Sequence, residues 1–95
     1  MNDVIYKLLT EEDYLSFKKF SIHIGPNKCI DMFLTLEQVE DAKQKYSDST
    51  KLYLLHIDTN SLGLSKIKYI SDTIVRFYGI LYEIDVIDVI DVTIV

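Results

Sequence analysis

The chain has 95 residues, 48% hydrophobic and 26% charged, and its formal net charge is −5. This composition is typical of a globular domain and excludes a disordered or fibrous chain, so we expect a single domain over residues 1–95. With one arginine and a net negative charge, the chain lacks the clustered cations of a nucleic-acid surface, so no nucleic-acid partner is expected.

Cysteine content and apolar runs predict a cytoplasmic protein. The one cysteine, Cys29, cannot form an internal disulfide, and the N-terminal sequence MNDVIYK has no basic region followed by a long apolar run. No stretch reaches the roughly 18 uninterrupted apolar residues that a membrane span needs. We therefore expect a soluble, cytoplasmic chain without a membrane partner.

The first part of the chain predicts a strand, a capped helix and a turn. Apolar residues at 4–9 fit a buried strand, and Thr10 before three acidic residues fits the N-cap of a helix ending near Phe20. Residues 22–24 fit a brief strand. They are followed by Gly25-Pro26-Asn27, which is the clearest turn signal in the sequence.

A second helix and a series of strands are predicted next. Thr35 and Gln38 form a capping box, which predicts a helix start. Residues 51–57 are nearly all apolar, as in a strand covered on both faces, and we expect this strand at the centre of the sheet. Three shorter elements follow: a capped helical turn or loop at 58–63 and strands at 66–70 and 74–78.

The C-terminal segment, residues 80–95, contains the triplet Ile-Asp-Val three times in succession. Its β-branched residues favour a strand, but a period of three does not match a strand's period of two, so we expect a bulge or bend near 86–88. Its aspartates, Asp85, Asp88 and Asp91, would protect a strand edge. The order of elements predicts an α+β fold with a small mixed or antiparallel sheet and two main helices.

Four ordered blocks carry a family resemblance: IYKLL at 5–9, FLTLEQV at 33–39, KLYLLHID at 51–58 and RFYG at 76–79. Through them nearly the whole chain resembles the bacterial domain of unknown function 952. The resemblance implies an ADP-ribosyltransferase-like fold. The matching positions include Tyr6-Lys7, Thr35, Gln38, Val39, Leu54, Leu55, Asp58, Tyr78 and Gly79. The family's two histidine positions hold Met32 and Arg76, and its glutamate position holds Ile70.

The resemblance implies a cleft that binds NAD, ADP-ribose or a related nucleotide, with ADP-ribosyl transfer or hydrolysis as the chemistry. Tyr6, Lys7, Arg76 and Tyr78 would line this cleft. Arg76 carries a planar fork of donors suited to pyrophosphate, although an arginine at a strand end is more often solvated or salt-bridged. The tyrosines can stack on a ring or simply pack in the core.

Candidate catalytic residues are fewer. His23 precedes the 25–27 turn and has acid–base chemistry near neutral pH, whereas His56 lies within an apolar strand and is expected to be a hydrogen-bonded structural residue. Glu83 is a candidate by fold analogy, because ADP-ribosyltransferase-like folds use a late-strand glutamate. The sequence has no pair of metal-ligand residues at the spacing of a known type of metal site, so it predicts no metal site.

Two classes of function follow from the sequence. In the first, the domain binds a nucleotide in the cleft. In the second, the loss of the family histidines leaves an inactive scaffold that contacts another protein, or forms a homodimer through its C-terminal strand.

Overall fold

A computed structural model describes residues 3–47 and 50–93 and shows an α+β fold built on a six-stranded antiparallel sheet. The strand order is β5-β6-β3-β1-β4-β8. The strands of this sheet are β1 (Val4–Thr10), β3 (Ile30–Phe33), β4 (Leu52–Asp58), β5 (Ile67–Tyr69), β6 (Ile74–Phe77) and β8 (Val86–Asp91). The remaining elements are the two-stranded sheet of β2 (Ile22–His23) and β7 (Leu81–Tyr82), helices α1 (Glu11–Phe20), α2 (Leu36–Lys43) and α3 (Thr59–Leu62), and 3-10 turns η1 (Pro26–Lys28), η2 (Leu64–Lys66) and η3 (Glu83–Asp85). The predicted fold class, with two main helices, is confirmed.

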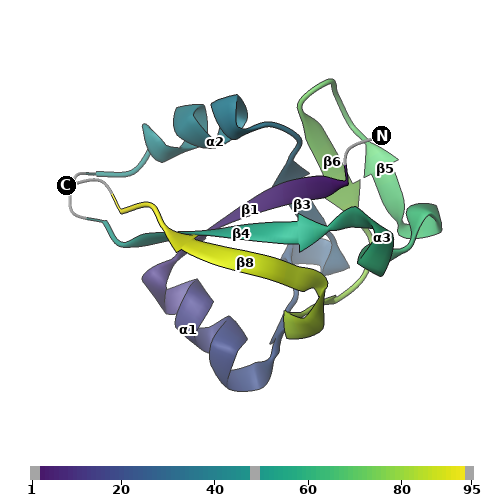
Figure 1. The fold of residues 1–95 in the computed structure, drawn as a ribbon, viewed down its shortest axis with the longest axis horizontal. Helices are drawn as coiled ribbons and strands as arrows, with labels where there is room; N and C mark the ends of the chain where they lie inside the picture. The colour runs from purple at the N-terminus through teal and green to yellow at the C-terminus, as the bar shows by residue number, and fades with distance from the viewer. Residues whose placement is uncertain (1–2, 48–49, 94–95) are drawn as a thin grey trace.

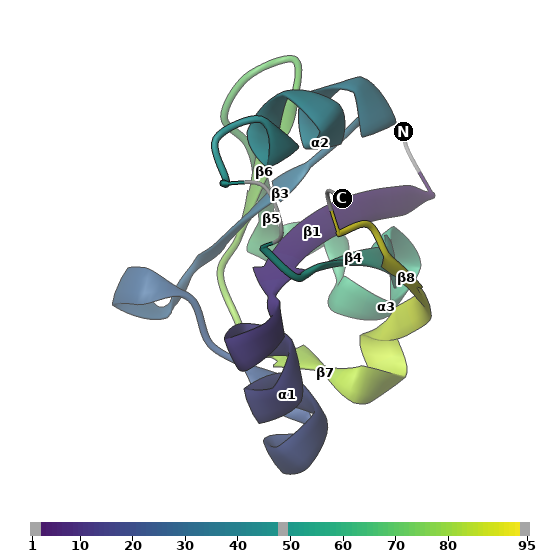
Figure 2. The ribbon, with the colours of Figure 1, turned by 90° about the vertical axis from the view of Figure 1, so that its left-hand side faces the viewer.

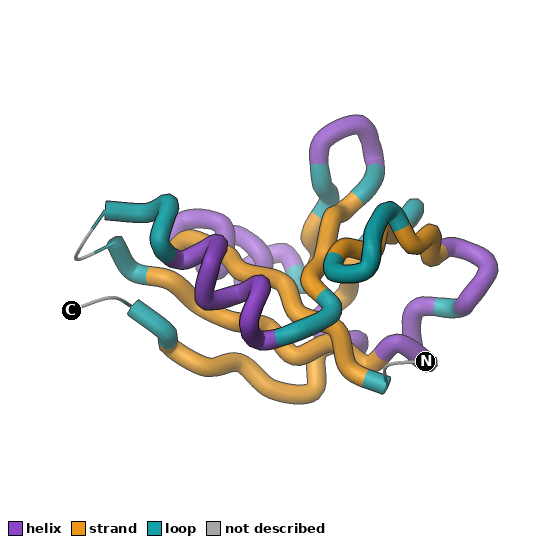
Figure 3. The backbone as a smooth tube through the Cα atoms, turned by 90° about the horizontal axis from the view of Figure 1, so that it is seen from above, coloured by secondary structure: helices purple, strands orange, loops and turns teal. Residues whose placement is uncertain are grey.

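One main helix covers each face of the large sheet (Figure 1). Because side chains alternate along a strand, β1 supplies two cores. Ile5 and Leu9 join the core that contains Phe17 of α1, whereas Leu8 joins the core that contains Val39 of α2. Seen from above, helical segments lie on the near and far sides of the strands (Figure 3).

The helix starts agree with the predicted caps. The Thr10 hydroxyl accepts a hydrogen bond from the Asp13 N–H at 3.4 Å, and the Thr35 hydroxyl accepts one from the Gln38 N–H at 3.3 Å. Asp58 caps the short helix α3 through the Asn60 N–H at 3.0 Å. Among the described residues, no helix is long and apolar enough to cross a membrane.

The sheet divides into two halves that meet at β1 and β3. The β1–β4 ladder is continuous from Val4 opposite Asp58 to the other end of both strands. By contrast, β1 and β3 are in register at one pair, Tyr6 opposite Phe33, and β3 then turns away from β1 (Figure 2). The predicted position of β4 at the centre is wrong, since β4 lies between β1 and β8, next to the edge strand. The centre is the divergent junction of β1 and β3.

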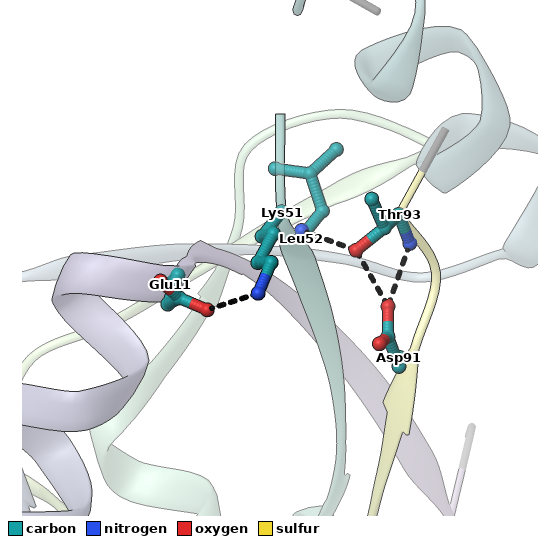
Figure 4. A network of polar contacts seen from close by, with 5 residues as sticks. All are labelled: Glu11, Lys51, Leu52, Asp91 and Thr93. Atoms are coloured by element: carbon teal, nitrogen blue, oxygen red, sulfur yellow. Dashed lines mark hydrogen bonds and ion pairs between the residues drawn. The ribbon is translucent and has the colours of Figure 1, made fainter. Parts of the chain in front are cut away.

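The C-terminal segment contains the predicted bulge. His56 pairs with Asp88 and Ile57 with Val86, so Ile87 has no opposite residue on β4. The segment is not one strand, however, because η3 separates β7 from β8. At the far end of β4, the Leu52 N–H donates to the Thr93 hydroxyl at 3.1 Å, and that hydroxyl donates to Asp91 (Figure 4). Residues 94–95 of the predicted strand lie outside the described residues.

The prediction that three aspartates protect the strand edge is wrong for Asp85. This residue is 6% exposed, and its carboxylate accepts hydrogen bonds from the Ser61 hydroxyl and from the Tyr82 N–H, the latter at 2.9 Å. A 3-10 turn replaces the strand at this point, so the side chain points inward and connects η3 to α3. Asp88 and Asp91 lie exposed on the edge strand β8, as expected.

Candidate functional site

A cleft of about 280 Å³ lies beside the junction where β1 and β3 diverge. Its lining residues are Lys7, Asn27, Cys29, Ile30, Asp31 and Arg76. They come from β1, from the turn before β3, and from the facing strands β3 and β6. Lys7 and Arg76 are therefore brought together as the sequence predicts, although they are separated by most of the chain.

Arg76 forms a bidentate ion pair with Asp31. The two residues face each other across the β3–β6 ladder, and Nε and one terminal nitrogen of Arg76 donate to the two carboxylate oxygens at 2.7 and 3.2 Å. The hydrogen bond from Arg76, together with its charge, lowers the pKa of Asp31, and Asp31 raises the pKa of Arg76. Both side chains are partly exposed, at 36% for Arg76 and 52% for Asp31. The interpretation of Arg76 as a salt-bridged residue is thus correct, and Arg76 also lines the cleft.

Lys7 reaches across the gap between the two halves of the sheet. Its Nζ donates to the main-chain carbonyl of Asp31 at 3.2 Å. Burial lowers the pKa of Lys7, and the nearby charges of Asp31 and Asp13 offset that effect only in part. The cleft therefore contains a desolvated amine beside a guanidinium that is already paired.

The turn between β2 and β3 forms one wall of the cleft. Gly25 is required there, because a Cβ at this position would lie 1.8 Å from the Cys29 carbonyl oxygen. Asn27 and Lys28 both have left-handed φ values of 57° and 62°. This tight turn projects from the body of the molecule (Figure 2), and it places Asn27 and Cys29 in the cleft.

A second, apolar hollow of about 440 Å³ is lined in part by residues that follow cleft residues in the sequence. Its lining residues are Ile24, Lys28, Tyr78, Gly79 and Ile80. Tyr78, after Asp31, also contributes to the raised pKa of Arg76, so its side chain lies close to the guanidinium. Gly79 packs directly against the Phe77 ring, since a Cβ there would lie 2.7 Å from it.

His23 lies on the α1 side of the sheet, close to Lys7. It packs edge-on against Phe17 with ring centroids 6.5 Å apart, and a third hollow of about 300 Å³ has His23 and Asp13 among its lining residues. Burial lowers the pKa of His23, the charge of Lys7 lowers it further, and Asp13 opposes both effects. The imidazole is therefore electrostatically coupled to the Lys7 amine.

Two predicted residues lie elsewhere. Tyr6 points to the α2 side, where it packs edge-on against His56 at 5.1 Å; side-chain alternation separates it from its neighbour Lys7. Glu83 lies in η3 instead of a strand and accepts a hydrogen bond from the Ser21 hydroxyl at 3.2 Å. Neither residue lines the cleft.

The other positions considered in the sequence analysis have packing roles. His56 is a packed residue as expected, but its Nε2 is buried without a hydrogen-bond partner. Met32, at a family histidine position, is fully buried in the core of the α1 face. Within residues 3–47 and 50–93, no three His, Cys, Asp or Glu side chains gather as a metal site.

Asp31 and Asn27 are site residues that the sequence analysis did not identify. Asp31 lies between two apolar residues of a short strand, which gives it an exposed position but no partner. Its partner depends on the pairing of β3 with β6, which joins residues 45 positions apart. For Asn27, the turn signal at Gly25-Pro26-Asn27 is the one feature of the sequence that points to a special position.

Fold and site together define a small α+β protein with a mixed-charge cleft at a divergence in an antiparallel sheet. Neither a family model nor a curated protein sequence matches the chain. Among solved structures, the chain is similar to the crystal structure of protein CC0527 from Caulobacter crescentus, with a TM-score of 0.76 and 21% identity over 93% of this chain and 84% of that one. A doubly substituted variant of that protein gives a TM-score of 0.75 and 20% identity over the same shares. These similarities establish a shared fold.

Proposed function

We propose that the chain is an ADP-ribosyltransferase-like domain, as its resemblance to the domain of unknown function 952 implies, and that it binds a nucleotide of the NAD or ADP-ribose type. The observation that carries this proposal is a pair of unlike hollows. Lys7 and Arg76 line a cleft, and Tyr78, two residues after Arg76, lines an apolar hollow. A nucleotide has the same two parts, because its phosphates need cations and its rings need apolar surface.

The charges in the cleft support a phosphate as the anchoring group. Lys7 and Arg76 carry two positive charges against one carboxylate, Asp31, while the whole chain carries −5. Arg76 has five N–H donors, and Asp31 engages two of its nitrogens. The donors left over can meet a phosphate oxygen without breaking the ion pair. The rings would then lie between Tyr78 and the isoleucines of the apolar hollow.

A thermal-shift titration with NAD, ADP-ribose, AMP, nicotinamide and inorganic pyrophosphate tests the proposal. A ligand that binds only the native state at 100 times its Kd stabilises it by about 2.7 kcal/mol, so the melting temperature rises with concentration. Lys7→Met is expected to lose this response, while the exposed control Lys45→Met keeps it. No shift from any nucleotide at millimolar concentration removes the proposal.

Asp31→Asn gives a sharper version of the same test. The carboxylate of Asp31 engages two nitrogens of Arg76, and its negative charge lies beside the remaining donors that a phosphate would use. Removing its charge frees the guanidinium, so phosphate ligands are expected to bind more tightly than to wild type. Weaker binding by Asp31→Asn contradicts a phosphate at this position, and an Arg76→Ala variant that responds like wild type contradicts the role of Arg76.

The second candidate function is a protein-interaction scaffold, which the edge strand β8 favours. Strand β8 pairs with β4 on one side and forms one edge of the sheet, and it exposes Ile87 and Ile90 at 61% and 40%. An added strand from a second copy would make the homodimer expected from the sequence. Sedimentation over a range of concentrations tests this proposal. Ile87→Lys is expected to weaken such a dimer, whereas Ile84→Lys, just before the strand, serves as control; a monomer at every concentration contradicts it.

A further inference from the structure

The amine of Lys7 differs from a surface lysine in its partners. Its Nζ donates to a main-chain carbonyl, which is neutral. Among the ion pairs of the described residues, Lys43 and Lys51 bond carboxylates, whereas the carboxylate nearest in the cleft, that of Asp31, bonds Arg76. Lys7 therefore lies in the wall of the cleft without a carboxylate partner of its own.

The setting of this amine makes the loss of its proton easier than in an exposed lysine. Desolvation is the largest influence on Lys7 and lowers its pKa, and Asp31 and Asp13 compensate in part. A lysine amine attacks carbonyl carbon only when it is unprotonated, and burial is how proteins activate lysines for this chemistry. The pKa direction agrees with the geometry, in which a cleft of about 280 Å³ gives a small molecule access to Lys7.

We propose that Lys7 forms an imine with a small aldehyde or ketone that carries an anionic group, held in the cleft beside Arg76. The inference uses the cleft of the proposed function but does not require a nucleotide as its ligand. Anionic character is expected of the carbonyl compound because Arg76 has five N–H donors and Asp31 engages only two of its nitrogens.

The chemistry is a condensation without oxidation or reduction. The neutral amine adds to the carbonyl carbon, the new N–C bond forms, and the carbonyl oxygen becomes a hydroxyl as the nitrogen gives up a proton to water. The C–O bond of this carbinolamine then breaks, and the hydroxyl leaves with a proton as water. One molecule of water is released for each imine, so no further reactant is needed.

The experiment compares three probes that separate the carbonyl group from the anion. Pyridoxal 5′-phosphate carries both groups, pyridoxal lacks the phosphate, and pyridoxine 5′-phosphate lacks the aldehyde. Each aldehyde is added below the protein concentration, the imine is reduced with borohydride, and the modified lysines are located by mass spectrometry of the digested protein. Wild-type protein suffices, because every other lysine acts as an internal control.

We expect the reduced adduct on Lys7 to exceed that on the exposed Lys18, Lys45 and Lys68 severalfold. Labelling of Lys7 should rise with pH about a midpoint below the ordinary value of 10.5. Adducts spread evenly over the exposed lysines, or a Lys7 less labelled than they are, overturn the inference. Lys7→Arg, which keeps a cation and a donor, should remove the selective adduct while the fold, followed by circular dichroism, is retained.

The two proposals fail separately in this design. Selective labelling of Lys7 by pyridoxal 5′-phosphate but not by pyridoxal, without any response to ADP-ribose or NAD, supports the inference and counts against the nucleotide. Binding of pyridoxine 5′-phosphate and ADP-ribose with unselective labelling supports the anion site and overturns the inference. Protection of Lys7 from labelling by ADP-ribose supports both, because the two ligands would then share the cleft.

Discussion

Asp85 and Asp88 occupy equivalent positions in successive Ile-Asp-Val triplets, but we predict opposite consequences for their removal. Asp85 is buried and accepts hydrogen bonds from Ser61 and from the Tyr82 N–H. Asp88 is exposed, and its carboxylate accepts a hydrogen bond from the next N–H along the chain. The pair is therefore a matched comparison of one residue type in one local sequence.

The magnitude follows from the bonds that each alanine substitution removes. A hydrogen bond to a charged group contributes about 1.5–3 kcal/mol, and an orphaned buried donor adds to the loss. Asp85→Ala removes two such bonds, one of them to a partly exposed serine, so we expect a loss of about 3 kcal/mol in the free energy of unfolding. Asp88→Ala removes one exposed contact and should change it by no more than about 0.5 kcal/mol.

Urea unfolding followed by circular dichroism measures both effects. With a slope of about 1 kcal/mol per molar urea, Asp85→Ala should lower the midpoint by about 3 M. Ser61→Ala and the double variant complete a cycle, in which a coupling of at least about 0.5 kcal/mol is expected between residues in direct contact. Equal losses for Asp85→Ala and Asp88→Ala would refute the structural distinction between the triplets.

Three further predictions concern the core and the cleft. His56→Phe should raise the free energy of unfolding by about 1 kcal/mol, because it removes a buried nitrogen that has no partner; a loss of stability in urea contradicts this. The pKa of His23, followed by proton NMR, should lie below 6.5, because burial and then the charge of Lys7 lower it, and it should rise in Lys7→Met. Since the folded state favours the neutral imidazole, the free energy of unfolding should decrease as the pH falls below 6.5. Gly25→Ala should unfold at lower urea than wild type, because its Cβ would collide with the Cys29 carbonyl; an unchanged midpoint contradicts that geometry.

Local chemistry accounts for the parts of the fold that the sequence predicts. Thr10 and Thr35 precede helices for a reason contained within four residues, namely that their hydroxyls meet unsatisfied N–H groups. The bulge in β8 follows from the mismatch between a three-residue repeat and a two-residue pleat, and it appears beside Ile87. These features need no knowledge of the partner strand.

The site depends on non-local pairing and was predictable only in part. Lys7 and Arg76 were identified because the family resemblance marks their blocks. Asp31 was not, because its role comes from the β3–β6 register. The family resemblance puts Tyr6 in the cleft with Lys7, but adjacent residues of a strand face opposite sides of the sheet. The sequence around Asp85 predicts an edge strand, but a 3-10 turn forms there.

The structural and chemical roles of Lys7 arise from the same defect in the sheet. Past the pair of Tyr6 and Phe33, β1 and β3 separate, and the Asp31 carbonyl accepts its hydrogen bond from the Lys7 side chain. Such a carbonyl needs a donor, and a lysine is long enough to supply one across the gap. The same reach places an amine in a desolvated cleft. Lys7→Arg can satisfy the carbonyl but cannot form an imine, and Lys7→Met can do neither. If both variants lose imine formation but only Lys7→Met loses stability, the structural role of Lys7 is separate from its chemical role.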